Sequence, residues 1–167
     1  FLKEKIQKES NKNTSVDLRQ LSAQQLQILH EQGNIDAAFF LGTCYKIGRN
    51  GVQQDAVKAI RLFEEVIQSG GGRESYGYTE IAEIYKYGYG VPVDYSKAFK
   101  YASIAAEGGN ATAKLILADM YKNGEGMHQN HEKAFQLFKE AADNNGNAVA
   151  FREVAQALFM ARGVAQN

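Results

Sequence analysis

Apolar residues recur at helical spacing along most of the chain. Three similar segments step by three and four residues: Ala59, Leu62, Phe63, Val66; Ala98, Tyr101, Ala102, Ala105; and Ala134, Leu137, Phe138, Ala141. This spacing places apolar side chains on one face of an α-helix. Each segment follows Asp-x-x-Lys-Ala or Asn-x-x-Lys-Ala, and Asp or Asn caps helix N-termini. The pattern therefore predicts three helices that start just after residues 55, 94 and 130.

A second set of predicted helices precedes these and repeats regularly. Segments 41–45, 81–85, 117–121 and 154–158 each run apolar, small, polar, variable, then Tyr or Leu. The last position advances by 40, 36 and 37 residues. After each segment come small residues, in order Gly48 and Gly51, Gly88 and Gly90, Gly124 and Gly126, then Ala161 and Gly163. Because glycine adopts positive φ without a Cβ clash, these residues predict a turn inside each helical hairpin.

The period divides the chain into helix-turn-helix units. We expect repeats at about 34–72, 73–109 and 110–146, a partial repeat at 147–167, and a half-unit at 21–33 that supplies only a second helix. Residues 1–20 form a separate N-terminal segment with a polar stretch at 9–15. The chain starts without Met and stops where a repeat would enter its second helix, so we expect an excerpt or a processed product.

Several residues of each unit resemble the Sel-one-like repeat. The third unit reads Gly109-Asn110-x-x-Ala113-x-x-x-Leu117-Ala118-x-x-Tyr121-x-x-Gly124-x-Gly126, then Asn130-x-x-Lys133-Ala134 and Ala141-Ala142. The resemblance covers about residues 21–167. It implies an all-α, right-handed α-solenoid related to tetratricopeptide repeats. Departures are an extra residue in the first turn, Arg73-Glu74-Ser75 at the second repeat's start, and Leu158 in the tyrosine column.

Composition narrows the classes of partner. Nineteen basic residues balance nineteen acidic ones, so the chain lacks the positive field that nucleic acids or anionic membranes attract. No apolar run approaches the roughly 20 residues that span a bilayer, so no membrane insertion is expected. A single cysteine, Cys44, permits no intrachain disulfide and leaves cytoplasmic and extracytoplasmic locations open.

The residues that could carry chemistry have structural interpretations. His128 and His131 complete no known metal pattern and are expected at the surface, and His30 is interpreted as structural or neutral. Cys44 occupies an apolar column and is predicted to be a buried hydrophobe. The tyrosine column, Tyr45, Tyr85 and Tyr121, is predicted to belong to the core. We therefore expect no catalytic, cofactor-binding or metal-binding residues.

A partner-binding groove is predicted if tetratricopeptide geometry applies, since first helices then line the concave side. Its candidate residues form three columns plus Tyr87: Thr43, Glu83, Asp119, Gln156; Lys46, Lys86, Lys122, Phe159; and Phe39, Thr79, Leu115, Arg152. One interpretation pairs Glu83 with Lys86 and Asp119 with Lys122 as solvated i,i+3 pairs, worth about 0.2 to 0.5 kcal/mol each. The other has the lysine column bind acidic or carbonyl groups of an extended segment or helix, with the apolar residues as anchors.

The resemblance implies a protein-interaction scaffold or adaptor. An inhibitor or immunity protein for one enzyme or toxin is the alternative, because it would use the same groove. A hydrolase acting on β-lactams, described for some family members, is disfavoured because no Ser-x-x-Lys motif is present. The last predicted helix exposes Val154 and Leu158, so that end of the array is a candidate surface for self-association.

Overall fold

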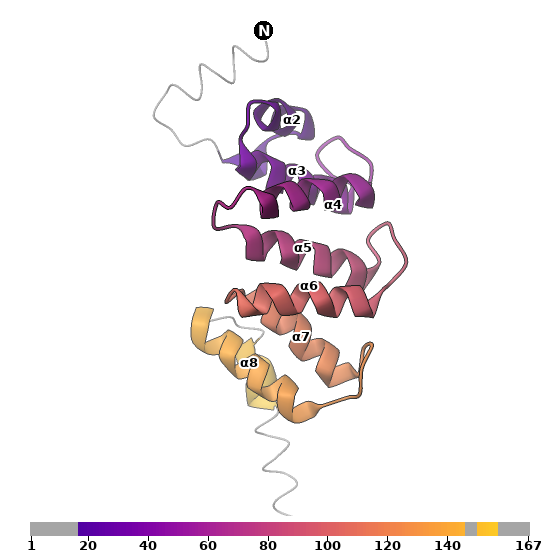
Figure 1. Ribbon diagram of the computed structural model, residues 1–167, viewed down its shortest axis with the longest axis vertical. Coiled ribbons are helices and arrows are strands. Elements are labelled where there is room, and N and C mark those ends of the chain that lie inside the picture. Colours follow the sequence, from indigo (N-terminus) through magenta and orange to yellow (C-terminus); the bar gives the residue numbers. More distant parts are fainter. Residues whose placement is uncertain (1–16, 146–149, 157–167) are drawn as a thin grey trace, which may run out of the picture.

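The computed structural model describes residues 17–145 and 150–156, and every element in this part of the chain is helical (Figure 1). A short 3₁₀ helix, η1, spans Leu18–Gln20. Seven α-helices follow: α2 (Ala23–Glu31), α3 (Ile35–Ile47), α4 (Ala56–Gln68), α5 (Glu74–Tyr87), α6 (Tyr95–Glu107), α7 (Ala111–Asn123) and α8 (His131–Asn145). Residues 150–156 form one more helical segment. The helices stack along the long axis of the molecule, which confirms the predicted all-α solenoid.

Side-chain caps explain where most of the helices begin. Asp55 and Asp94 accept backbone N–H bonds from Lys58 and Lys97 at the starts of α4 and α6. Asn130 does the same at the start of α8. These caps satisfy amides that have no partner inside the helix, and they stand at the predicted positions. Helix α5 has no side-chain cap, because Arg73 occupies the position where α3 and α7 have Asn.

The hairpin turns have one recurring geometry. Gly48, Gly88 and Gly124 end the first helices with φ of 70°, 69° and 70°, a left-handed conformation that favours glycine. The backbone N–H of the residue that caps each second helix then donates to the carbonyl of the column tyrosine, at 2.8–2.9 Å. The first three turns predicted from glycine spacing are thereby confirmed, and the fourth, at Ala161 and Gly163, lies outside the described residues.

The extra residue of the first turn has a local role. Asn50 has φ of 58°, and its side-chain amide donates to the Leu21 carbonyl at 2.9 Å. Its own carbonyl accepts a bond from the backbone N–H of Ala23 at 2.9 Å. The insertion therefore ties the first complete repeat to the start of α2.

The first helices α3, α5 and α7 form one row, and the second helices α4, α6 and α8 form the other. Adjacent first helices contact each other more closely than adjacent second helices do, as expected if the first helices line the inner side of the array. Small residues allow close packing within a repeat, since a Cβ on Gly42 would lie 2.8 Å from the Phe63 ring. Cys44 is only 1% exposed, so its prediction as a buried hydrophobe is confirmed.

Each column tyrosine packs beneath a lysine of its own repeat. The ammonium groups of Lys58, Lys97 and Lys133 lie 5.2, 4.8 and 4.7 Å from the ring centroids of Tyr45, Tyr85 and Tyr121, respectively. Such contacts are worth about 0.5–1 kcal/mol at exposed sites. All three tyrosines also pack against buried clusters, as predicted for the column. The lysine of the Asp/Asn-x-x-Lys motif therefore covers the tyrosine at the edge of the core.

Among the described helices, none is long and apolar enough to cross a membrane.

Candidate functional site

The predicted lysine column lies beneath the surface in its first two members. Lys46 and Lys86 are each 6% exposed. The Lys46 ammonium donates to Glu80 Oε2 at 2.6 Å and to Glu83 Oε2 at 2.7 Å. Both carboxylates belong to α5, the first helix of the following repeat. Lys46 is therefore held inside the junction between two repeats.

The next two lysines follow the same rule with different acids. Lys86 Nζ lies 3.5 Å from both Asp119 Oδ2 and Glu125 Oε2, from α7 and from the turn after it. Lys122 Nζ donates to Glu153 Oε2 at 2.6 Å, and its side chain is 41% exposed. At these three junctions, a lysine of one repeat pairs with one or two carboxylates of the next.

The interpretation of these charges as i,i+3 pairs within a helix is wrong. Glu83 pairs with Lys46 and not with Lys86, and Asp119 pairs with Lys86 and not with Lys122. These pairs form between repeats because stacking encloses Lys46 and Lys86 beside carboxylates of the next repeat. Solvated pairs along one helix have no such enclosure and are worth little.

Burial and charge act against each other in the Lys46 cluster. Burial alone would lower the pKa of Lys46, but the charges and hydrogen bonds of Glu80 and Glu83 outweigh it, so the pKa is raised. Burial raises the pKa of Glu80 despite the opposing effect of Lys46, and the charge of Glu83 adds to the rise. We attribute these directions to two half-enclosed carboxylates that share one ammonium.

The column of Phe39, Thr79 and Leu115 also points into packed regions. The Phe39 ring packs edge-on against Phe63 and Tyr76. Thr79 is 5% exposed, and its hydroxyl donates to the Ser75 carbonyl at 2.6 Å. Leu115 packs against clusters shared with α8. These three positions are therefore not an open groove.

The last repeat differs at the same column. Arg152 is exposed, with its guanidinium 3.5 Å from Glu153 Oε1. Phe159, also a predicted groove residue, lies outside the described residues, as does Leu158. Val154 is partly buried against Ala118, Ala134 and Phe138 in the core, so it is less exposed than the sequence suggested.

The column that does face solvent is that of Thr43, Glu83, Asp119 and Gln156. On α5, residues at steps of four, three and four share the helix face of Glu83. They are Tyr76, Glu80, Glu83 and Tyr87. Tyr76 and Tyr87 are each 51% exposed, and Ile47, at the matching position of α3, is 43% exposed. Of these three, the sequence reasoning named only Tyr87. A helical wheel centred on Glu83 finds Tyr76 as well.

We name this surface the inner stripe: Ile47 and Thr43 of α3, Tyr76, Glu80, Glu83 and Tyr87 of α5, and Asp119 of α7. It lies opposite the buried side of the first helices, where Ile81 and Ala82 are 0% exposed. Three large apolar or aromatic side chains are therefore presented to solvent among carboxylates.

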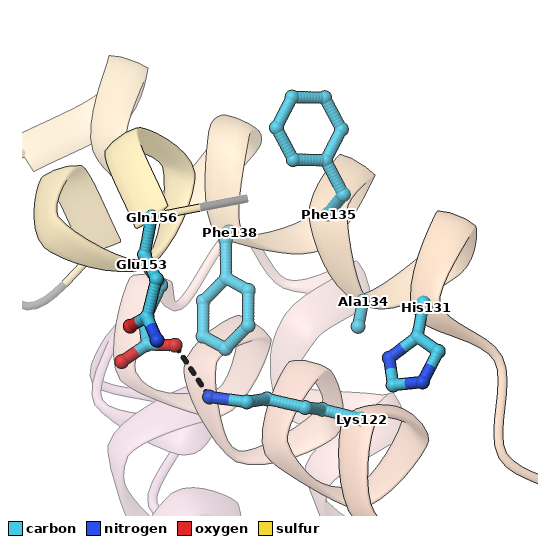
Figure 2. A pocket seen from close by; sticks show the side chains of 7 residues that line it. All are labelled: Lys122, His131, Ala134, Phe135, Phe138, Glu153 and Gln156. Carbon is cyan, nitrogen blue, oxygen red and sulfur yellow. Dashed lines mark hydrogen bonds and ion pairs between the residues drawn. The ribbon is translucent and has the colours of Figure 1, made fainter. Parts of the chain in front are cut away.

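A hollow of about 400 Å³ lies at the far end of the array (Figure 2). Figure 2 shows the Phe138 ring directed toward the space between Lys122 and the helical segment 150–156, with the Lys122–Glu153 ion pair closing one side. Its lining is Lys122, His131, Ala134, Phe135, Phe138, Glu153 and Gln156.

The repeat explains the position of this hollow. At the two preceding junctions, the residue equivalent to His131 is approached by a glycine of the next turn. A Cβ on Gly126 would lie 2.7 Å from Tyr95 Cβ, and a Cβ on Gly90 would lie 3.3 Å from Ala56 Cβ. The equivalent turn of the fourth unit, 161–164, is outside the described residues. The hollow lies where a glycine of the following repeat packs at the two preceding junctions.

The histidines offer little chemistry. His30 Nε2 lies 2.7 Å from Glu65 Oε2, which links α2 to α4. His128 and His131 are exposed, as expected from the sequence. Within residues 17–145 and 150–156, no three His, Cys, Asp or Glu side chains are grouped to hold a metal ion.

Comparison with known proteins agrees with the repeat geometry. The Sel1 repeat model matches residues 35–70, 75–110 and 111–146. A Sel1 repeat protein from Oxalobacter formigenes is similar in structure, with a TM-score of 0.66 and 28% identity over 85% of this chain and 63% of that one. A protective antigen of uropathogenic Escherichia coli strains, which displays an SLR fold, gives 0.64 and 27% over 84% of this chain and 29% of that one.

This chain therefore spans less than two thirds of either structure. No curated protein matches it. Sel1 repeat proteins are generally protein-interaction modules and are typically non-catalytic. With three consecutive repeats matched over most of its length, the chain belongs to the Sel1 repeat family.

Proposed function

We propose that this protein is a non-catalytic scaffold or adaptor that binds a partner protein through the inner stripe. The observation that carries the proposal is the exposure of Ile47, Tyr76 and Tyr87 on the solvent side of consecutive first helices. Aromatic side chains that are half exposed on a rigid surface are the common anchors of protein interfaces. An extended segment or a helix of the partner fits a surface that runs across the repeats.

The proposed stripe keeps Thr43, Glu83, Tyr87 and Asp119 of the predicted groove and leaves out its lysine column. Lys46 and Lys86 are already paired with carboxylates of this chain, so a partner that used them would have to displace Glu80, Glu83, Asp119 or Glu125. Breaking a buried pair costs about 3–5 kcal/mol, which works against such a mode.

Site-specific photo-crosslinking in the native cell tests the proposal. A photoreactive phenylalanine analogue would replace Tyr76 or Tyr87 on the stripe, and in matched controls Val57 or Ile104 on second helices, which are 67% and 37% exposed. We expect a discrete crosslinked heteromer from the stripe positions alone. Equal crosslinking from the control positions, or none from Tyr76 and Tyr87, would contradict the proposal. Recovery of one enzyme as the crosslinked partner would favour the inhibitor form of this function.

A further inference from the structure

The arrangement of charge on the inner stripe indicates the chemistry of the partner. At the first junction, Glu80 and Glu83 share Lys46, and at the second, Asp119 and Glu125 share Lys86. Each cluster thus holds two carboxylates for one ammonium and has a formal charge of minus one. The excess at two successive junctions is negative, although the chain as a whole is neutral.

The lysines are also buried more deeply than the carboxylates that pair with them. The side chains of Lys46 and Lys86 are 8% and 4% exposed, whereas those of Glu83 and Asp119 are 24% and 42% exposed. The ammonium groups are therefore enclosed by the protein, and the carboxylates are what an approaching molecule contacts first. The cations nearby are Arg49, whose charge acts on Glu80, Arg73, which pairs with Asp36, and Lys122, which pairs with Glu153.

Aromatic rings flank the carboxylates. On α5, Tyr76 and Tyr87 stand three helical turns apart on one face, with Glu80 and Glu83 between them. A guanidinium or ammonium can approach such a carboxylate while its aliphatic stem packs on a tyrosine ring. The Tyr87 ring already lies 5.1 Å from the Lys86 ammonium, so its contribution is apolar contact. A second copy of this chain would bring the same acidic surface and be repelled by it.

Resting on the proposed function above, we infer that the partner segment is basic and apolar, with Arg or Lys contacting Glu83 and Asp119 and apolar side chains contacting Ile47, Tyr76 and Tyr87. This is the opposite charge preference from the one that the lysine column suggested in the sequence. Opposite charges on the two partners also raise the association rate at low salt.

Fluorescence anisotropy with synthetic peptides tests this inference on the full chain. The probes are three labelled peptides of equal length that combine Arg with Leu, Arg with Ser, or Glu with Leu. We expect the Arg/Leu peptide to bind most tightly, the Arg/Ser peptide at least about fivefold more weakly, and the Glu/Leu peptide not to bind. Because exposed charges are screened within about 8 Å at physiological salt, Arg/Leu affinity should fall as salt is raised.

Two variants of equal net charge separate the stripe from general attraction. The double variant Glu83→Gln/Asp119→Asn removes two stripe carboxylates and leaves Lys46 paired with Glu80 and Lys86 with Glu125. The control Glu64→Gln/Glu107→Gln removes two exposed acids from second helices. We expect at least tenfold weaker Arg/Leu binding in the stripe variant and less than a twofold change in the control.

If the stripe variant and the control variant lost the same affinity for the Arg/Leu peptide, the inference would be overturned, because only net charge would then matter. Tighter binding of the Glu/Leu peptide, or no binding of the Arg/Leu peptide, would also overturn it. In either case, discrete crosslinks from Tyr76 and Tyr87 would leave the proposed function standing. If Tyr76 and Tyr87 gave no crosslinks, both the proposed function and the inference about the partner would be overturned.

Discussion

The first two repeat junctions place a lysine at the same position and neutralise it in different ways. Lys46 forms hydrogen bonds of 2.6 and 2.7 Å to two carboxylates of one helix, α5. Lys86 lies 3.5 Å from one carboxylate of α7 and one of the following turn. The lysine position is therefore a property of the repeat, whereas the acids come from whichever nearby backbone brings a carboxylate within reach. A buried ammonium must be paired with a carboxylate, but the stacking of repeats does not fix which residue supplies that carboxylate.

Replacing Lys46 with Met has the largest expected effect. The substitution keeps the apolar stem but leaves Glu80 and Glu83, whose side chains are 19% and 24% exposed, side by side with only the exposed Arg49 near Glu80. We expect a loss of about 3 kcal/mol in the free energy of unfolding, measured by urea denaturation. Lys86→Met should lose less, about 2 kcal/mol, because Asp119 can turn to water whereas Glu125 Oε2 stays buried without its cation.

A triple variant tests whether unpaired carboxylates cause the loss of stability in Lys46→Met. Adding Glu80→Gln and Glu83→Gln to Lys46→Met should restore more than half of the lost stability, because no unpaired charge remains in the junction. Equal losses for Lys46→Met and Lys86→Met would show that the two junctions are energetically alike. A failed rescue would show that the unpaired carboxylates do not cause the loss.

The turn glycines give the next largest effect. Gly126 and Gly90 occupy equivalent places with φ of 77° and 75°, so alanine is strained at both by about 1 kcal/mol. Only at Gly126 does the added Cβ also clash, 2.7 Å from Tyr95 Cβ, against 3.3 Å to Ala56 Cβ at Gly90. We expect Gly126→Ala to lose about 2 kcal/mol and Gly90→Ala about 1 kcal/mol, by thermal and urea unfolding. Gly109→Ala, with positive φ but an open Cβ position, is the control for backbone strain alone.

The smallest effect concerns acid sensitivity of the helix caps. Backbone hydrogen bonds from Lys97 and Lys58 lower the pKa of Asp94 and of Asp55, respectively, below the ordinary value of 3.8. Because the folded state binds these protons less tightly than the unfolded chain, the caps stabilise above pH 3.8 and lose that contribution as pH falls through the lowered pKa.

Asp55→Asn/Asp94→Asn should leave stability at pH 7 nearly unchanged, since Asn caps as well as Asp, as Asn130 does naturally. Below pH 4 the variant should lose stability less steeply than the parent chain, measured by urea unfolding across the pH range. Glu80, whose pKa is raised, is present in both proteins and so does not affect the difference. Parallel pH profiles would contradict this account.

Much of the fold follows from local rules that a sequence displays. The caps at Asp55, Asp94 and Asn130 and the glycine ends of the first helices were predictable because each depends on residues within one turn of helix. The predicted groove residues remain a prediction, but the structure shows that two of its columns are enclosed. The lysine column and the Phe39 column repeat as regularly as a groove would. Lys46 and Lys86 are nevertheless enclosed against the next repeat, and Phe39, Thr79 and Leu115 pack largely within their own repeats. Periodicity alone does not distinguish an enclosed position from an exposed one.

The sequence by itself determined the helix pairs, their period, their turns and the family, because propensity, capping and apolar spacing act over short distances along the chain. Only the tertiary structure decided which carboxylate neutralises which lysine, and therefore which charge the surface presents. Glu83 and Lys86 are three residues apart in sequence. In the stacked repeats, Glu83 pairs with Lys46 of the preceding repeat, and Lys86 pairs with Asp119 of the following one. The physical reason is that an ammonium enclosed between repeats must be paired, and the pair is supplied by the next repeat.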